Sequence, residues 1–178
     1  MRKPLAAAGT AAFLIVPGVV AGLLPWLLTG WRLRQPAPWW AWPPLRVAGG
    51  VMVAAGAVVL IQAFVRFVLE GAGTPAPIAP TERLVVGGLY RYVRNPMYLA
   101  VVTTIVGQGL VLGQSGLFAY AATAAGAMAA FVHWYEEPAL QSKFEAQYEA
   151  YRRAVPAWWP RRHPWQPAGE DRPTAGEP

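Results

Sequence analysis

The stretch "RNPMYLAVVTTIVGQGLVL", Arg94–Leu112, places an arginine and an Asn-Pro pair directly before a long apolar run. Asparagine is favoured at the N-cap of a helix, and proline is favoured at the first helical position. The pair therefore predicts a helix that begins at Pro96 and continues through the apolar run. A bilayer core needs roughly 20 apolar residues as helix, so this run is short, and a re-entrant or tilted segment is the alternative to a full span.

Three further uncharged runs surround this one, at Ala6–Leu28, Val47–Val65 and Leu117–Val132. The first two are long enough to cross a bilayer as helices. Only "GQSG" separates the run that follows Pro96 from the last run, so these two runs are expected to form a hairpin. The sequence therefore predicts an all-α fold, an integral membrane bundle of about four transmembrane helices.

The composition supports a membrane protein and narrows its chemistry. The chain is 55% hydrophobic and 13% charged, with a mean hydropathy of +0.29, whereas a soluble domain carries about 25% charged residues. It has no cysteine and two histidines. Disulfides, thiolate metal ligands and a thiol nucleophile are therefore excluded, and we expect no metal site.

The distribution of basic residues predicts the orientation. Four spans place both termini and the middle loop on one side of the membrane, and of the 15 lysines and arginines only Arg32, Arg34 and Arg46 fall on the other side. The positive-inside rule then places both termini in the cytoplasm. Arginine greatly outnumbers lysine and alanine is abundant, which favours a GC-rich bacterial genome. Together with the four spans, this predicts a multi-pass protein of a bacterial inner membrane. No basic patch on a soluble fold favours nucleic acid as a partner.

A polar helical pattern follows the last apolar run, in "EEPALQSKFEAQYEAYRRAV", Glu136–Val155. Apolar side chains recur there on one helical face, at Leu140, Phe144, Tyr148, Tyr151 and Val155. Glu149 lies four residues before Arg153, which is the spacing of a stabilising ion pair. We expect an amphipathic helix at the cytoplasmic membrane surface. The chain then divides into one membrane domain, residues 1–160, and a flexible polar tail, residues 161–178.

The first candidate site is the start of the helix at Pro96. A helix N-terminus presents unpaired N–H groups and a partial positive charge, to which Arg94 adds a full charge. Tyr90 and Tyr98 add rings and hydroxyl groups beside it. This arrangement favours a carboxylate or phosphate at the membrane surface. The alternative is an ordinary helix cap with positive-inside arginines and an interfacial aromatic belt, and the residues leave both open.

The second candidate site is the pair Glu136–Glu137. Adjacent carboxylates near a helix C-terminus repel each other and the helix dipole, a cost that is often tolerated for function. Alternatively, Pro138 begins a new helix, whose N-terminus favours the carboxylates. The hairpin brings this pair to the same membrane face as Arg94. One site offers a positive pole and the other a negative pole, so a zwitterion with a further cationic centre would fit between them.

These motifs together resemble the integral-membrane methyltransferases, which include isoprenylcysteine carboxyl methyltransferase and the phospholipid N-methyltransferases. The family pattern falls here on Gly88, Tyr90, Arg94, Asn95, Pro96 and Tyr98, then Glu136, Glu137 and Leu140, and finally Phe144, Tyr148, Tyr151, Val155 and Pro156. The resemblance covers residues 47–160, and "GTPAP", Gly73–Pro77, is similar to the bacterial branch. The chain departs from the pattern at Ala100 and Glu145, where the family often has glycine, and at Ala157, where it often has arginine.

The resemblance implies an enzyme that uses S-adenosylmethionine as cofactor, held at the cytoplasmic face. The implied cofactor-binding residues are Tyr90, Arg94, Asn95, Pro96, Tyr98, His133, Glu136 and Glu137. Arg94 and Glu137 carry the implied catalytic roles, and Arg152 is expected on the solvated side of the amphipathic helix. The implied acceptor is lipophilic, an isoprenylcysteine-like carboxylate or a phospholipid amine that enters from the bilayer. For His133, an interfacial hydrogen-bonded histidine is the alternative.

Three other functions remain to be weighed. A membrane reductase of the sterol type shares a related C-terminal fold and would use NADPH, but the Glu-Glu pair and its spacing fit the methyltransferases better. A four-span drug exporter needs a carboxylate within the membrane, and the first three spans contain none. A small non-catalytic membrane protein stays open on sequence alone.

Overall fold

The computed structural model describes residues 15–35, 41–70 and 84–166, with side chains left out at 67–70. The parts of the predicted first span before residue 15, the "GTPAP" segment and residues 167–178 lie outside the described residues. The described elements are η1 (Val19–Leu23), α2 (Leu24–Thr29), α3 (Trp42–Glu70), η3 (Gly88–Arg91), α4 (Pro96–Leu112), α5 (Gly116–Phe131), η4 (Val132–Glu136) and α6 (Glu137–Ala154). No strand occurs in these three ranges, and the predicted all-α fold is confirmed.

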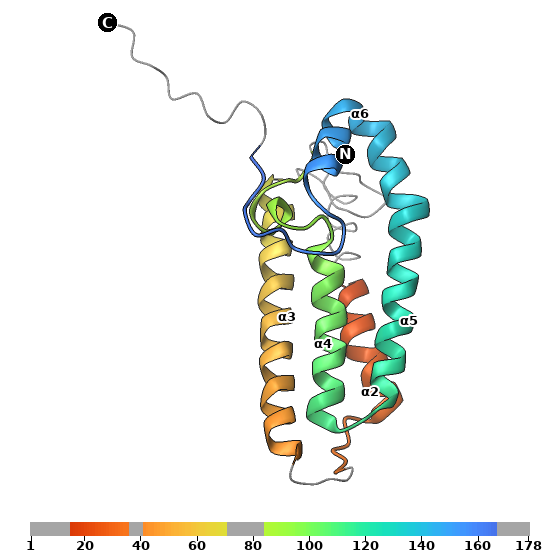
Figure 1. Ribbon diagram of the computed structural model, residues 1–178. Coiled ribbons are helices and arrows are strands. Elements are labelled where there is room, and N and C mark those ends of the chain that lie inside the picture. The colour runs from red at the N-terminus through yellow and green to blue at the C-terminus, as the bar shows by residue number, and fades with distance from the viewer. Residues whose placement is uncertain (1–14, 36–40, 71–83, 167–178) are drawn as a thin grey trace, which may run out of the picture.

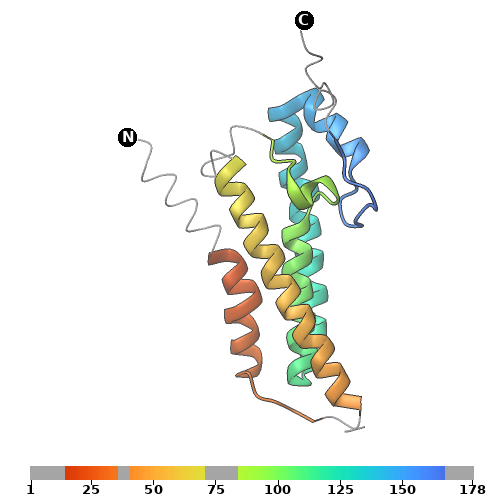
Figure 2. The ribbon, with the colours of Figure 1, turned by 90° about the vertical axis from the view of Figure 1, so that its left-hand side faces the viewer.

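The helices form an elongated bundle in which α3, α4 and α5 run side by side (Figure 1). The view at right angles shows the first helix, which contains η1 and α2, running along the same bundle (Figure 2). The η3 turn, α6 and the C-terminal segment all lie at one end, which we call the polar end. The core of the bundle is apolar, and Ile105 of α4 and Leu117 of α5 are fully buried in it.

Four apolar helices account for the four predicted spans. Trp42–Arg66 and Gly116–Ala154 are long and apolar enough to cross a membrane, whereas Ile15–Thr29 and Pro96–Leu112 are shorter. The third predicted span is therefore the 17-residue helix α4, which begins at Pro96 as predicted. An α-helix rises ~1.5 Å per residue, so α4 is roughly 25 Å long, a little less than a bilayer core.

Glycines allow α3 and α4 to pack with their backbones in contact. A Cβ atom on Gly49 would lie 2.6 Å from the carbonyl oxygen of Gly107, and a Cβ atom on Gly107 would lie 2.7 Å from that of Gly49. Two turns further along α3, Gly56 approaches Thr104 and the carbonyl oxygen of Ala100 in the same way. Small residues at such positions are how membrane helices approach closely, because lipid supplies no hydrophobic force between them.

The first helix is joined to the bundle by side-chain hydrogen bonds to its π-helical turn. Pro25 has no N–H group to donate to the carbonyl oxygen of Ala21, four residues earlier. The amide of Gln108 on α4 donates to that oxygen instead, at 2.6 Å. The hydroxyl of Tyr120 on α5 donates to the neighbouring carbonyl of Val20, at 2.8 Å. These two hydrogen bonds therefore fix the first helix against the hairpin.

The helix of the last span continues directly into the amphipathic helix. A single π-helical turn, η4, joins α5 to α6, and the backbone N–H of Glu137 donates to the carbonyl of Val132. Pro138 occupies the first turn of α6. Glu136 thus lies at the end of the span and Glu137 at the start of α6. The sequence had left open whether the pair ends one helix or begins the next, and each alternative holds for one of the two glutamates.

The predicted amphipathic helix is present, but it is interrupted at Glu145. This residue has φ 42° and ψ −116°, which divides α6 into two helical pieces. The second piece buries Tyr148, Tyr151 and Val155. The predicted ion pair between Glu149 and Arg153 is confirmed, with Arg153 Nε 2.8 Å from Glu149 Oε1. The break therefore redirects α6 so that its aromatic face packs onto the polar end.

Replacing Glu145 with glycine is expected to stabilise the fold by about 1 kcal/mol. A residue with a side chain in this backbone region costs of order 1–3 kcal/mol, whereas glycine adopts it without a steric penalty but loses more backbone entropy, about 0.5–1 kcal/mol. The pattern that the sequence resembles often has glycine at this position, which is the residue that this conformation favours. Thermal unfolding in detergent should show a higher midpoint for Glu145→Gly. Ala150→Gly, at an exposed position of regular helix, should lower the midpoint, and a lower midpoint for both variants would contradict the strain at Glu145.

Candidate functional site

The polar end brings together three parts of the chain, two of which the sequence predicted as candidate sites. The first is the η3 turn and the start of α4, the second is the η4–α6 junction, and the third is the segment that follows α6, residues 155–166 (Figure 1). The hairpin of α4 and α5 places the Arg-Asn-Pro motif beside the Glu-Glu pair, as predicted. The break at Glu145 then brings the second piece of α6 over both.

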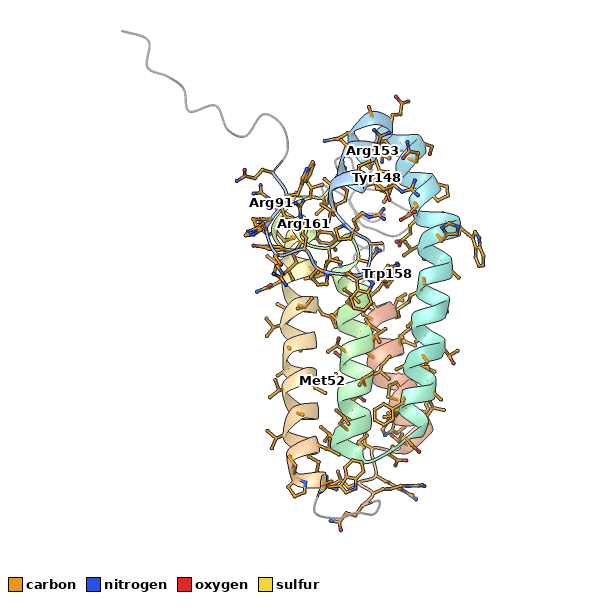
Figure 3. All side chains as sticks on the ribbon, viewed as in Figure 1. Met52, Arg91, Tyr148, Arg153, Trp158 and Arg161 are labelled. Atoms are coloured by element: carbon orange, nitrogen blue, oxygen red, sulfur yellow. The ribbon has the colours of Figure 1, made fainter. Side chains whose placement is uncertain are left out.

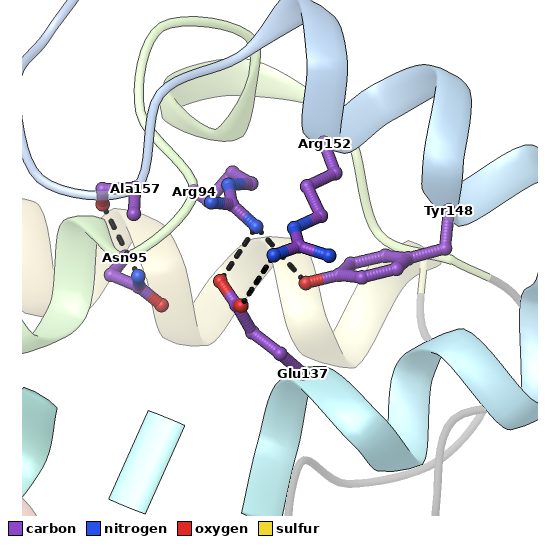
Figure 4. A network of polar contacts seen from close by, with 6 residues as sticks. All are labelled: Arg94, Asn95, Glu137, Tyr148, Arg152 and Ala157. Carbon is purple, nitrogen blue, oxygen red and sulfur yellow. Dashed lines mark hydrogen bonds and ion pairs between the residues drawn. The ribbon is translucent and has the colours of Figure 1, made fainter. Parts of the chain in front are cut away.

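Arg94 and Glu137 form the centre of this cluster. Arg94 Nη1 lies 2.8 Å from Glu137 Oε1, and the two side chains are 12% and 14% exposed. Figure 4 shows the hydroxyl of Tyr148 beside them, where Arg94 Nη1 donates to it at 3.1 Å. A charge-assisted hydrogen bond between such sheltered groups is stronger than one in water. This pair therefore holds the start of α4 against the junction.

Arg152 is exposed, as expected for the solvated side of the helix, but it also faces Glu137. Its Nη2 atom is 3.6 Å from Glu137 Oε2, although its side chain is 47% exposed. Tyr148 and Arg152 are one turn apart, so they share the face of α6 that the break turns toward α4. One carboxylate therefore meets two guanidinium groups, and this part of the cluster carries an excess of positive charge (Figure 4).

Glu136 is held separately, by Tyr98. The tyrosine hydroxyl donates to Glu136 Oε1 at 2.5 Å. The ring of Tyr98 also lies 6.4 Å from that of Trp158, which comes from the segment after α6. Adjacent glutamates thus take different partners on the same helix, one a hydroxyl and the other two cations.

Asn95 occupies the predicted N-cap position, but its side chain does not cap the helix. No cap hydrogen bond is formed by this side chain. Its amide instead donates to the carbonyl of Ala157 at 3.2 Å. Pro96 is buried at the first helical position. The sequence thus predicted the helix start correctly and the hydrogen bond wrongly, because the competing acceptor lies 62 residues away along the chain.

The segment after α6 runs along the Arg-Asn-Pro motif and is joined to it by backbone hydrogen bonds. Arg94 N–H donates to Pro156, Arg161 N–H to Tyr92 and Trp165 N–H to Arg91, at 2.9–3.0 Å. Residues 161–166, assigned on sequence to a polar tail, therefore pack against η3. Arg161 also donates to the carbonyl of Ala154 at the end of α6.

Tyr90 is buried at the base of this arrangement. Its carbonyl accepts a hydrogen bond from the hydroxyl of Tyr151 at 2.8 Å. Burial raises the pKa of the Tyr90 hydroxyl well above its ordinary value, and neighbouring Tyr151, Glu136 and Tyr98 act in the same direction. The hydroxyl therefore stays protonated at physiological pH and can act as a hydrogen-bond donor.

His133 is the predicted site residue that the cluster leaves aside. It is exposed on η4, and its ring lies edge-on to that of Trp134 with 6.1 Å between the ring centroids. Conversely, Tyr148 and Arg152 belong to the cluster although sequence reasoning did not place them there. Their spacing of one helical turn was visible in the sequence, but the direction in which α6 turns was not.

The sequence suggested a ligand between a positive site at Arg94 and a negative site at the Glu136–Glu137 pair, and the structure shows a different arrangement. Arg94 and Glu137 are in direct contact, so a ligand cannot lie between them in this arrangement. The buried Nε atom of Arg94 nevertheless has no hydrogen-bond partner. A buried donor without a partner is costly. Arg94 and Arg152 together form the kind of donor set that binds a carboxylate.

A protein-family model matches more than half of the chain, including most of the residues of this site. The family model described as PEMT, phospholipid methyltransferase, matches residues 45–147. The match includes α3 from Leu45 onward, the η3 turn, α4, α5 and the Glu-Glu pair, and it ends just before Tyr148. No curated protein and no solved structure matches the chain.

Proposed function

The chain belongs to the phospholipid methyltransferase family, and we propose on this premise that it transfers the methyl group of S-adenosylmethionine to a lipophilic acceptor at the membrane. Membrane methyl transfer is the general activity of the family. The observation that supports the cofactor most strongly is the cluster of Arg94, Glu137 and Tyr148 with its unpartnered guanidinium nitrogen.

The residues of the cluster divide by charge into two proposed roles. Arg94, with Arg152 beside it, would hold the carboxylate of the cofactor, since guanidinium groups bind carboxylates with paired hydrogen bonds. Glu136 and Glu137 would hold its ammonium and hydroxyl groups. Asn95 and Pro96 shape the backbone at this site, and Tyr90 and Tyr98 supply hydroxyl donors. When bound, the cofactor supplies a methyl group already activated on a sulfonium.

Orientation is the main contribution that these residues can make to methyl transfer. A rigid site that aligns two reactants provides much of the rate enhancement for such a step. The family's description names phospholipid as the substrate class, and a phospholipid amine must also lose a proton. Glu137 is the proposed catalytic carboxylate in the sense that it steers the acceptor, with Arg94 as its positioning partner. An isoprenylcysteine-like carboxylate is the other acceptor class, and it needs no base.

The proposal also places the polar end, with both termini, in the cytoplasm. The excess of arginine on that side supports this orientation. A reporter enzyme fused after Pro178 should be active only if the C-terminus is cytoplasmic. A periplasmic C-terminus would contradict the four-span arrangement and the side of the membrane on which the cofactor must bind.

Binding of the methyl-transfer product S-adenosylhomocysteine tests the proposed cofactor directly. At a ligand concentration 100 times the dissociation constant, binding should stabilise the folded protein by about 2.7 kcal/mol and raise its unfolding temperature in detergent. NADPH serves as the comparison ligand because related membrane reductases use it. A clear shift with NADPH and none with S-adenosylhomocysteine would replace the methyltransferase proposal with a reductase.

A further inference from the structure

Three arginines lie at the end of the bundle opposite the polar end, which we call the outer end. Arg32 and Arg34 belong to the outer segment, Trp31–Gln35, which follows α2, and Arg46 lies near the start of α3. The end of α4 and the start of α5 lie at the same end of the bundle (Figure 1). Figure 3 shows the labelled Arg153 at the polar end, so the outer arginines form a separate basic group.

No carboxylate balances the charge of these three arginines. The first acidic residue of the chain is Glu70, and none occurs between Pro96 and Tyr135. The segments that form the outer end therefore contain no acidic residue. The ion pairs of the described residues include none of the three arginines. The Nε atom of Arg46 is in addition buried without a hydrogen-bond partner. The outer end thus carries three positive charges and no counter-ion from its own segments.

Hydrogen bonds to the backbone hold these arginines close to one another. Arg46 Nη2 donates to the carbonyl of Arg34 at 3.1 Å. The backbone N–H of Arg34 donates to the carbonyl of Leu112 at 2.8 Å, and the amide of Gln114 donates to the carbonyl of Arg32 at 2.8 Å. The outer segment is therefore joined to α3, to the end of α4 and to the turn before α5. Cations held close together repel each other, and an anion that contacts several of them relieves this repulsion.

The outer segment also exposes large apolar side chains. Trp31 is 56% exposed and Leu33 is 64% exposed, and they alternate along the chain with two exposed arginines. Leu27 and Leu28, in the last turn of α2, are each 62% exposed. Apolar and cationic groups side by side suit the boundary between the acyl chains and the headgroups of a bilayer, where tryptophan is enriched and arginine attracts anionic lipid.

We propose that the outer end binds an anionic phospholipid of the leaflet that it faces, with the phosphate held by Arg32, Arg34 and Arg46 and the acyl chains beside Trp31 and Leu33. Guanidinium groups bind phosphate oxygens through paired, charge-assisted hydrogen bonds. The exposed apolar side chains favour a lipid over free phosphate, which would contact the arginines alone.

This lipid site is remote from the candidate site for methyl transfer. Arg94 directly precedes α4, whereas Arg34 is bonded to Leu112, the last residue of the same helix. The full length of α4, roughly 25 Å, therefore separates the two. The bound lipid is an anchor for the outer segment and for the helix ends joined to it, and it is not the methyl acceptor. The inference stands whether or not the polar end transfers methyl groups.

Titration of the full chain with lipid in detergent micelles tests the proposal. Native mass spectrometry measures the fraction bound to phosphatidylglycerol and, in parallel, to phosphatidylcholine, whose headgroup has no net charge. The wild type should bind phosphatidylglycerol more tightly. The variant Arg32→Gln/Arg34→Gln should bind it at least tenfold more weakly, because two of the three charges are lost. The matched control Arg153→Gln/Arg162→Gln removes two exposed charges from the polar end and should bind as the wild type does.

Several outcomes would overturn the proposal. Equal binding of phosphatidylglycerol by the wild type and the outer-end variant would do so, as would an equal loss in both double variants, which reports net charge alone. Equal affinity of the wild type for the two lipids would show that the anionic charge is not recognised. Displacement of the lipid by inorganic phosphate at the same concentration would assign the arginines to a free anion. If the outer-end double variant does not fold, Arg32→Gln and Arg34→Gln are tested singly, and at least one must weaken binding.

Discussion

Glu137→Gln is expected to weaken S-adenosylhomocysteine binding at least tenfold and to destabilise the protein without ligand. The variant removes the acceptor charge that faces both Arg94 and Arg152, at 2.8 and 3.6 Å. Loss of one charge-assisted hydrogen bond costs roughly 1.5–3 kcal/mol, which corresponds to about tenfold or more in affinity. Without the carboxylate, the two guanidinium groups repel each other, which further lowers the stability of the folded protein.

Arg94→Ala should have a still larger effect on stability, because it leaves a sheltered carboxylate with a more distant cation. Breaking a buried ion pair from one side costs about 3–5 kcal/mol, and the exposed Arg152 recovers part of this. A double-mutant cycle of Arg94→Ala and Glu137→Gln isolates the coupling. Thermal unfolding and ligand titration should both show that the double variant is less affected than the sum of the single variants.

The ion pair between Arg153 and Glu149 provides a matched control. Its N–O distance is also 2.8 Å, but its side chains are 78% and 34% exposed. Exposed pairs contribute ≈ 0–1 kcal/mol, so Arg153→Ala should leave stability and ligand affinity nearly unchanged. Arg152→Ala, by contrast, should weaken binding. If Arg153→Ala and Arg94→Ala had equal effects, the cluster would have no special role.

Local rules of helix formation were enough to predict much of this fold. The Asn-Pro pair gave the start of α4 at Pro96, and uncharged runs gave the four apolar helices. The short "GQSG" connection made a hairpin unavoidable, and the hairpin placed Arg94 near Glu137. These features depend on neighbours in the sequence, so the sequence contains the information directly.

The site details that sequence reasoning missed depend on distant parts of the chain. The amide of Asn95 binds the Ala157 carbonyl, and Arg152 meets Glu137, only because α6 breaks at Glu145 and turns back. Helical periodicity continues through this break, so the pattern of apolar residues gives no sign of it. The local signal was a glutamate at a position where the family often has glycine. It indicates an unusual backbone conformation at Glu145, but not the direction in which the second piece of α6 turns.

The adjacent glycines Gly49 and Gly50 should respond to the same substitution with opposite signs. A Cβ atom on Gly49 would lie 2.6 Å from the Gly107 carbonyl oxygen and 2.9 Å from the backbone nitrogen of Val111, and backbone atoms cannot rotate away. Nothing lies within 4 Å of a Cβ atom on Gly50. The sequence "GG" cannot distinguish the two residues, whereas the packing of α3 against α4 does.

Gly49→Ala is therefore expected to destabilise the protein by about 1–3 kcal/mol, the usual cost of overpacking, and Gly49→Leu by more. Gly50→Ala should stabilise it by about 0.5–1 kcal/mol, since alanine is the better residue within an exposed helix. Thermal unfolding in one detergent measures both. Because α4 carries Arg94 at its start, displacement of α3 by Gly49→Leu should also weaken S-adenosylhomocysteine binding. A Gly49→Ala protein as stable as Gly50→Ala would mean that α3 and α4 do not pack through these glycines.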